Sequence, residues 1–182
     1  NISSFELKDL VDSVQTTLEP YAKINRNNIQ INLPKKNIVV SSDELKIRQI
    51  LFNLLTNACK NSEESDINLN ITQETIKKRN FIAFKVQDFG VGIPKNKMKE
   101  IFEPFNQGNI IDNSKLKGTG LGLTISKTYS ELLGGYIHVK SKEGLGSTFT
   151  SYILQDYYQE KGKSKEYKIV EIPQISSFPQ KG

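Results

Sequence analysis

The chain has 182 residues and carries 25 Lys and Arg against 20 Asp and Glu, which gives a formal net charge of +5 at neutral pH. An apolar fraction of 36% is typical of one globular domain with its own core, and no apolar stretch approaches the length of a membrane span or a signal peptide. The single cysteine excludes an intrachain disulfide and favours a reducing compartment. Nucleic acid is not an expected partner, because the sequence has neither a basic stripe with aromatic residues nor zinc-finger spacing.

Hydrophobic periodicity predicts helices and strands along most of the chain. In chain order we expect a helix over 5–26, strands over 29–33 and 37–40, a helix over 41–62, strands over 66–76 and 80–89, a helix over 121–133 and strands over 135–141 and 146–154. Pro20 predicts a kink or an early end of the first helix, and Ser42 is the expected N-cap of the second. The strand over 37–40 is the expected hairpin partner of the strand before it.

Two segments lack regular patterns. Residues 90–118 form a long loop with a short expected helix near 95–102, and a loop of this length inside a compact domain is usually functional or mobile. The polar stretch 155–182 predicts a linker or flexible tail after a domain of residues 1–154. Because most predicted strands pair with their neighbours in sequence, we expect a two-layer α/β sandwich with helices on one face of an antiparallel or mixed sheet.

A glycine-rich turn, "KGTGLGLTIS" over 117–126, precedes the third predicted helix. Gly118, Gly120 and Gly122 allow a sharp bend or the close approach of another group. A turn of this kind that opens a helix is a natural anion site, because free backbone N–H groups and the positive end of the helix dipole point the same way. Glycine-rich turns also occur for purely steric reasons, so other residues have to decide between these interpretations.

A second candidate is the stretch "VQDFGVGIP" over 86–94, in which Asp88 ends a predicted strand and Gly90 and Gly92 follow it. A carboxylate at this place can accept a hydrogen bond from an exocyclic amine, while the glycines let a flat ring approach the backbone. The alternative is a hairpin turn with an acidic first residue.

A third candidate is the polar face formed by Asn53, Asn57 and Lys60 on the predicted helix 41–62. Asparagine oxygens suit Mg²⁺, and a lysine can contact a phosphate. The alternative is the solvent side of an amphipathic helix, although Asn has a weak helix propensity. Lysines at 95, 97, 99, 115 and 117 likewise indicate either a solvated loop or a basic rim around a polyphosphate. Together the three candidates predict a nucleotide site that fits neither a P-loop nor a dinucleotide fingerprint.

These stretches, taken in order, resemble the catalytic, ATP-binding domain of sensor and hybrid histidine kinases in the gyrase, Hsp90, histidine kinase and MutL superfamily. The resemblance covers about residues 5–154 and rests on "QILFNLLTNACKNS", "DFGVGIP", "IFEPFNQ", "GTGLGL" and "GGYIHVKSKEGLGSTF". It implies a Bergerat-type sandwich with a mobile ATP lid over 93–117, anchored by Phe102 and Phe105. Asn61 departs from the aromatic residue that many members of the family have after the lysine.

The resemblance also implies a role for each matching residue. Asn57 would bind Mg²⁺ with help from Asn53, Lys60 would contact phosphate, and Asp88 would receive the adenine amino group. Thr148 would support the adenine through water. The remaining residues expected to bind nucleotide are Gly90, Gly92, Ile93, Phe105, Gly118, Thr119, Gly120, Leu121, Gly122 and Leu123. Asn53 stands where hydrolytic relatives have a glutamate, and a neutral amide is a poor general base.

The function implied by the resemblance is the binding of Mg²⁺-ATP and donation of its γ-phosphate to a histidine on a dimerisation domain, in two-component signalling. The only histidine, His138, falls in a predicted strand, so we expect the acceptor, and a receiver domain where one takes part, outside this chain. We expect a cytoplasmic, monomeric fragment that does not phosphorylate itself. The fragment itself is not expected to contact a membrane, whereas the parent protein can be membrane-attached. The alternatives are a regulatory nucleotide-binding module without transfer activity and a hydrolytic relative.

Overall fold

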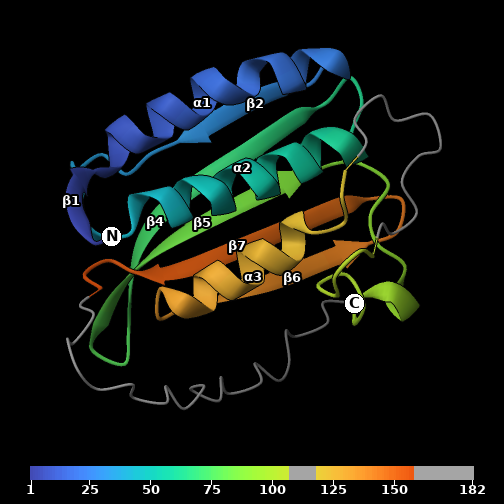
Figure 1. Ribbon diagram of the computed structural model, residues 1–182. Coiled ribbons are helices and arrows are strands. Elements are labelled where there is room, and N and C mark those ends of the chain that lie inside the picture. The colour runs from blue at the N-terminus through green and yellow to red at the C-terminus, as the bar shows by residue number, and fades with distance from the viewer. Residues whose placement is uncertain (107–117, 158–182) are drawn as a thin grey trace, which may run out of the picture.

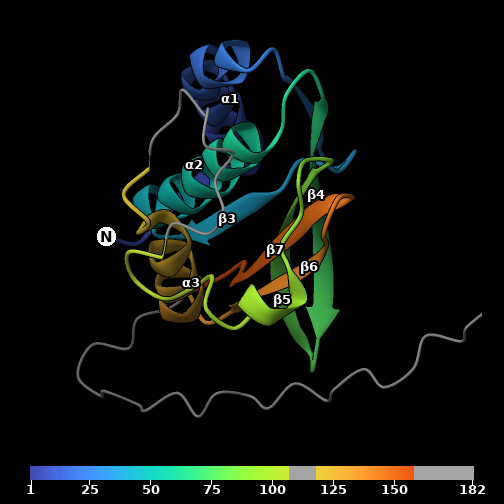
Figure 2. The ribbon, with the colours of Figure 1, turned by 90° about the vertical axis from the view of Figure 1, so that its right-hand side faces the viewer.

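The computed structural model describes residues 1–106 and 118–157. In these ranges three helices cover one face of a five-stranded sheet, as Figures 1 and 2 show. The helices are α1 (Leu7–Ile24), α2 (Glu44–Asn61) and α3 (Gly122–Leu132). The strands, in sheet order, are β2 (Asn28–Asn32), β4 (Asp66–Ile76), β5 (Arg79–Asp88), β7 (Gly146–Leu154) and β6 (Tyr136–Lys142). The predicted two-layer architecture with a mixed sheet is confirmed.

The core lies between the helices and the sheet, where apolar side chains of α1 and α2 meet those of β4, β5 and β7. Helix α1 continues past Pro20 to Ile24, so the expected early end is wrong. Two residues that follow Pro20 hold this last turn in place: Tyr21 packs edge-on against Phe52 at 5.3 Å between ring centroids, and Ala22 is buried. Packing of this turn outweighs the cost of a proline inside the helix. None of the helices in the described ranges has the length and hydropathy needed to cross a membrane.

The predicted hairpin between 29–33 and 37–40 is wrong. Strand β2 pairs in parallel with β4, whereas β3 (Val39–Ser42) pairs antiparallel with the N-terminal strand β1 (Ser3–Glu6) in a separate two-stranded sheet. Parallel pairing places the half-buried Ile29 and Ile31 of β2 opposite buried residues of β4 and directs both sets toward the core. A parallel pair needs a crossover, and β3 with α2 supplies it.

Strand β3 also holds the end of the described chain. The Ser41 N–H donates to the Gln155 carbonyl at 2.9 Å, and the Tyr157 N–H donates to the Ser41 carbonyl at 2.7 Å. The first residues of the expected tail are therefore paired with the domain, while residues 158–182 lie outside the described residues. The short helix expected near 95–102 is a single 3-10 turn, η1 (Lys95–Lys97).

The N-cap of α2 is Asp43 and not Ser42, which is the last residue of β3. The Asp43 carboxylate accepts from the Lys46 backbone N–H at 3.2 Å and from Lys46 Nζ at 2.7 Å. Burial opposes ionisation, but the hydrogen bonds from the Lys46 side chain and the amino group of Asn1 outweigh it and lower the pKa of Asp43 from 3.8 to about 2.

We expect Asp43→Ala to lower the free energy of unfolding by about 1–2 kcal/mol at neutral pH, because the helix loses its cap. A carboxyl whose pKa is depressed in the folded state stabilises above its unfolded pKa and loses this contribution as the pH falls toward the folded value. The difference from the wild type should therefore shrink below about pH 4, in urea titrations at a series of pH values. A constant difference down to the lowest pH would contradict this explanation, and Asp43→Asn, which keeps an acceptor, is the control.

Candidate functional site

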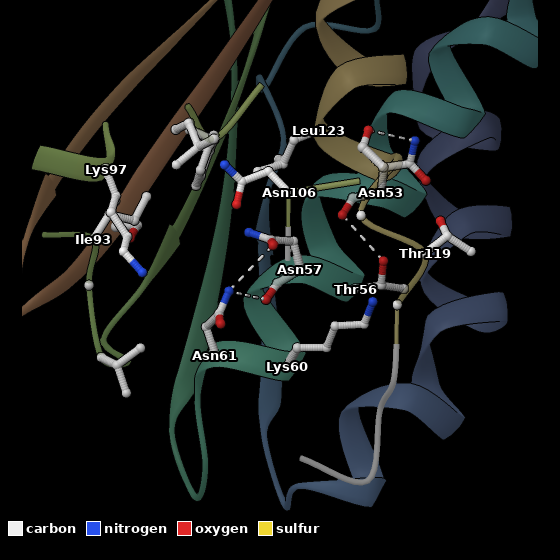
Figure 3. Close-up of a pocket in the computed structure, with 18 of the residues that line it drawn as sticks. Asn53, Thr56, Asn57, Lys60, Asn61, Ile93, Lys97, Asn106, Thr119 and Leu123 are labelled. Atoms are coloured by element: carbon white, nitrogen blue, oxygen red, sulfur yellow. Dashed lines mark hydrogen bonds between the residues drawn. The ribbon is translucent and has the colours of Figure 1, made fainter. Parts of the chain in front are cut away.

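A cavity of about 260 Å³ opens between the C-terminal half of α2, the loop after β5 and the glycine turn before α3 (Figure 3). Its lining contains two lysines and, among the described residues, no aspartate or glutamate. The lining residues are Phe52, Asn53, Thr56, Asn57, Lys60, Asn61, Val91, Gly92, Ile93, Pro94, Lys97, Ile101, Asn106, Gly118, Thr119, Gly120, Gly122, Leu123, Ser147 and Phe149. This combination of apolar walls, amides and cations favours a ligand with a flat apolar part and a negative part.

The predicted polar face of α2 points into this cavity. Asn53, Asn57 and Lys60 all line it, and Figure 3 shows them rising from the same side of the helix. The Asn53 Nδ2 donates to the Gly122 carbonyl at 3.0 Å, which ties α2 to the first residue of α3. The Asn57 carboxamide is held by Asn61, whose Nδ2 donates to the Asn57 carbonyl at 2.9 Å and to its Oδ1 at 3.3 Å. This face is therefore not a solvated helix surface.

Lys60 is a partly buried cation at one end of the cavity. Burial lowers the pKa of its ammonium group, and none of the ion pairs among the described residues involves it. A Cβ added at Gly118 would lie 2.3 Å from Lys60 Nζ, so the glycine makes room for the ammonium group. A negative ligand beside Lys60 would offset the cost of its burial.

The glycine turn faces the cavity with Gly118, Thr119, Gly120, Gly122 and Leu123, all of them residues that we expect to bind nucleotide. Gly120 has a φ of +74°, and a Cβ there would lie 2.9 Å from the Phe105 backbone. This close approach allows the Phe105 N–H to donate to the Gly120 carbonyl at 3.1 Å. Leu121 is the N-cap of α3 and does not line the cavity.

Asp88 is 3% exposed and lies at the end of β5, opposite Ser147 of β7. Burial raises the pKa of its carboxyl group, and hydrogen bonds from the backbone N–H groups of Gly90 and Ser147 work against this rise. Asp88 does not itself line the cavity, but its partner Ser147 does. The carboxylate is therefore a buried acceptor next to the cavity wall.

Thr148 is not placed as predicted. Asp88 pairs with Ser147, so these two side chains share one face of the sheet, and Thr148 points to the opposite face because side chains alternate along a strand. The hydroxyl on the cavity side belongs to Ser147, whose Oγ lies 2.8 Å from Ser141 Oγ. Ser141 Oγ also accepts from the Ile93 N–H at 2.8 Å, which joins the loop after β5 to strand β6.

The glycines after Asp88 serve close packing of this loop. Gly92 lines the cavity with a φ of +68°, and a Cβ there would lie 2.1 Å from the Lys142 carbonyl oxygen. Gly90 does not line the cavity. A Cβ at Gly90 would lie 1.7 Å from the Asn61 carbonyl oxygen, which accepts a hydrogen bond from the Val91 N–H at 3.2 Å.

The two phenylalanines expected to anchor the lid behave differently. Phe102 packs edge-on against Phe149 at 6.3 Å, and its carbonyl accepts from Thr124 Oγ1 at 2.9 Å. Phe105 is 73% exposed and does not line the cavity, so its side chain is not an anchor; only its backbone contacts the glycine turn. The rest of the expected lid, 107–117, including Lys115 and Lys117, lies outside the described residues.

Several lining residues were not among the predicted site residues. Lys97 was noted only as part of a lysine cluster, and Ser147 was missed because the choice between it and Thr148 depends on strand register. The lining also contains Phe52, Thr56 and Phe149, for which the sequence gives no separate signal, since apolar and small residues on the inner faces of helices and strands are typical of any core.

Residues 42–156 match a known family, described as "Histidine kinase-, DNA gyrase B-, and HSP90-like ATPase". The chain belongs to this family. It is similar to the sensor histidine kinase AruS of Pseudomonas aeruginosa, with 38% identity over 149 residues, which cover 80% of this chain and 15% of AruS. It is also similar to the circadian input-output histidine kinase CikA of Synechococcus elongatus, with 34% identity over 155 residues, or 84% of this chain and 20% of CikA. The chain thus spans a fifth or less of these two relatives.

Solved structures agree with the fold. Full-length ShkA in complex with AMPPNP has a TM-score of 0.68 and 26% identity, covering 87% of this chain and 32% of ShkA. The nucleotide-free catalytic domain of the histidine kinase ThkA has a TM-score of 0.64 and 23% identity, covering 87% of this chain and 99% of that domain. The predicted membership of the histidine kinase group, with its ATP-binding catalytic domain, is confirmed.

Proposed function

We propose that this histidine kinase domain binds Mg²⁺-ATP in the cavity and donates the γ-phosphate to a histidine on a dimerisation domain outside the described residues. The observation that carries the proposal is the lining itself: Asn53, Asn57 and Lys60 face the glycine turn, with no carboxylate among the described lining residues. Hydrolysis needs a base that activates water, and a neutral amide is a poor one. Transfer to another acceptor needs mainly positioning and charge neutralisation.

The residues present fit both ATP and its metal. Amide oxygens are ligands of the kind that Mg²⁺ accepts, and the metal keeps several waters and takes phosphate oxygens for the rest. Asn57, with Asn53 beside it, would hold Mg²⁺, and Lys60 and the backbone around Gly118 and Gly120 would hold phosphates. When bound, Mg²⁺ supplies charge neutralisation on the phosphates.

The adenine would lie toward the opposite end of the cavity, near the end of β5. Asp88 would accept a hydrogen bond from the adenine amino group, directly or through a water that Ser147 also contacts. Gly92 and Ile93 would pack against the base, because the glycine brings the backbone to the cavity wall. The apolar side chains of Val91, Ile101 and Phe149 suit a flat aromatic ring.

His138 is not the acceptor in this proposal. It is exposed on the edge strand β6 and pairs with Thr150, so its side chain lies on the sheet face opposite that of Ser147 and the helices. A phosphate in the cavity would have to cross the sheet to reach it. The acceptor histidine therefore belongs to a partner domain, and a receiver domain is the next partner where the parent protein has one.

Calorimetric titration with ATP, with and without Mg²⁺, tests binding first. Labelled γ-phosphate and a histidine-containing helical domain added in trans then test transfer. We expect Mg²⁺-dependent ATP binding, transfer to the added domain and little ATP turnover by the domain alone. Tight binding without transfer would favour a regulatory module, and Mg²⁺-dependent turnover by the isolated domain, abolished by Asn57→Ala, would favour a hydrolytic relative.

A further inference from the structure

One face of α2 carries four carboxamide side chains at intervals of four residues: Gln49, Asn53, Asn57 and Asn61. The two outer amides donate to the two inner ones. Gln49 Nε2 donates to Asn53 Oδ1 at 2.8 Å, and Asn61 Nδ2 donates to Asn57 Oδ1 at 3.3 Å. The inner pair lines the cavity, whereas Gln49 is exposed and lies outside its lining.

Both the oxygen and the nitrogen of the Asn53 carboxamide therefore have a hydrogen-bond partner. Its Oδ1 accepts from Gln49, and its Nδ2 donates to the Gly122 carbonyl at 3.0 Å. If the carboxamide rotated by half a turn, its NH₂ group would meet the Gln49 NH₂ group, and its oxygen would meet the Gly122 oxygen. The Gly122 contact would become repulsive, and the Gln49 contact would stay attractive only if Gln49 turned its own carboxamide as well. Gly122 therefore sets which end of Asn53 faces which way, and Gln49 holds the oxygen end in place.

This orientation matters because only the oxygen end of a carboxamide can face a cation. A carbonyl-type oxygen has two lone pairs, and the bond from Gln49 uses one of them. The other is left for a metal ion or for a water bound to it. An Asn53 side chain free to rotate would spend part of its time with NH₂ toward the metal, which repels it.

We propose that Gln49 is a positioning residue that, together with the Gly122 carbonyl, holds the orientation of the Asn53 carboxamide, so that its oxygen is available to Mg²⁺-ATP. The proposal rests on the proposed function, because it assigns a support to the same site. Gln49 acts only through Asn53 and touches neither nucleotide nor metal. Through the bond from Asn53 to Gly122, Gln49 also supports the junction of α2 with the glycine turn.

The test compares Gln49→Met, which keeps the length of the side chain without its donor, with Gln49→Lys, which restores a donor. Exposed Gln15 on α1 offers matched controls, Gln15→Met and Gln15→Lys, for the change of composition and charge. The readout is the ratio of ATP affinities with and without Mg²⁺, because a lost orientation changes only the first affinity. The Gln15→Lys control shows how far an added charge changes the ratio by itself. Thermal unfolding of each variant checks that the fold is kept.

We expect Gln49→Met to lower the affinity for Mg²⁺-ATP about three- to tenfold, the worth of one hydrogen bond, with Mg²⁺-free binding unchanged. Gln49→Lys should keep the wild-type ratio, and both Gln15 variants should match the wild type. A wild-type ratio in Gln49→Met would overturn the proposal while leaving the proposed function intact. A wild-type protein that binds no ATP would overturn the proposed function, and the role of Gln49 with it.

Discussion

Asp88→Asn is expected to lower the affinity for ATP about 100-fold while the protein stays folded. The carboxylate is buried beside the cavity and accepts from the Gly90 N–H at 3.0 Å through Oδ1, whereas an asparagine would turn an NH₂ group toward any amino group of the ligand. A donor that faces a donor in a buried place leaves both without a partner, which is costly. Calorimetry with ATP measures the loss.

The raised pKa of Asp88 explains why the fold should survive the change to asparagine. Burial raises this pKa, so the carboxyl group binds a proton more readily in the folded protein than in the unfolded chain. As the pH rises and the group ionises, its burial therefore lowers the free energy of unfolding. The neutral amide of asparagine removes the cost of burying a charge. Its oxygen can still accept from the Gly90 N–H, which lies 3.0 Å from Oδ1 in the wild type. Asp66→Asn on the exposed end of β4 is the control. Unchanged ATP affinity in Asp88→Asn would place the adenine elsewhere.

Gly90→Ala is expected to have the largest effect on stability, with a loss of about 3 kcal/mol in the free energy of unfolding. The added Cβ would lie 1.7 Å from the Asn61 carbonyl oxygen and 2.6 Å from its carbon, and backbone at the end of α2 cannot move aside as a flexible side chain can. The contact between α2 and the loop after β5 would have to open, so ATP binding should fall as well.

Gly144→Ala separates this clash from the general cost of replacing a glycine. A Cβ at Gly144 meets nothing within 4 Å, although its φ of +80° makes alanine strained by about 1 kcal/mol. Urea titrations of both variants give the comparison. Equal losses in the two variants would contradict the clash with Asn61, because Gly90 has no positive φ that an alanine would strain.

The parts of the site that could be predicted from the sequence are those that depend on local spacing. Asn53, Asn57 and Lys60 share a helix face whatever the rest of the chain does, and the glycine turn opens α3 by its own composition. The placement of Thr148 was wrong by one position, because the face of a strand residue depends on pairing with β5, which no local pattern reveals.

The same limit explains the errors in the fold. Residues 37–40 look like a hairpin partner for β2 because both segments are short and separated by a turn, yet each finds a distant partner. Strand β1 has only four residues and is mostly exposed, so it has too little alternation to be recognised. Phe105 is apolar and near a glycine turn, but its φ is +60° and its side chain is exposed, neither of which a local pattern reveals.

The parallel pairing of β2 with β4 has a consequence for the order in which the chain folds. The hairpins β4–β5 and β6–β7 can form as soon as their turns close, whereas β2 must wait for a partner that lies beyond the whole segment 33–65. Non-local pairing of this kind is slow, because the intervening chain has to be ordered before the contact is gained. During synthesis β2 is made early, but we expect it to join the sheet only after α2 has packed, as one of the last steps of folding.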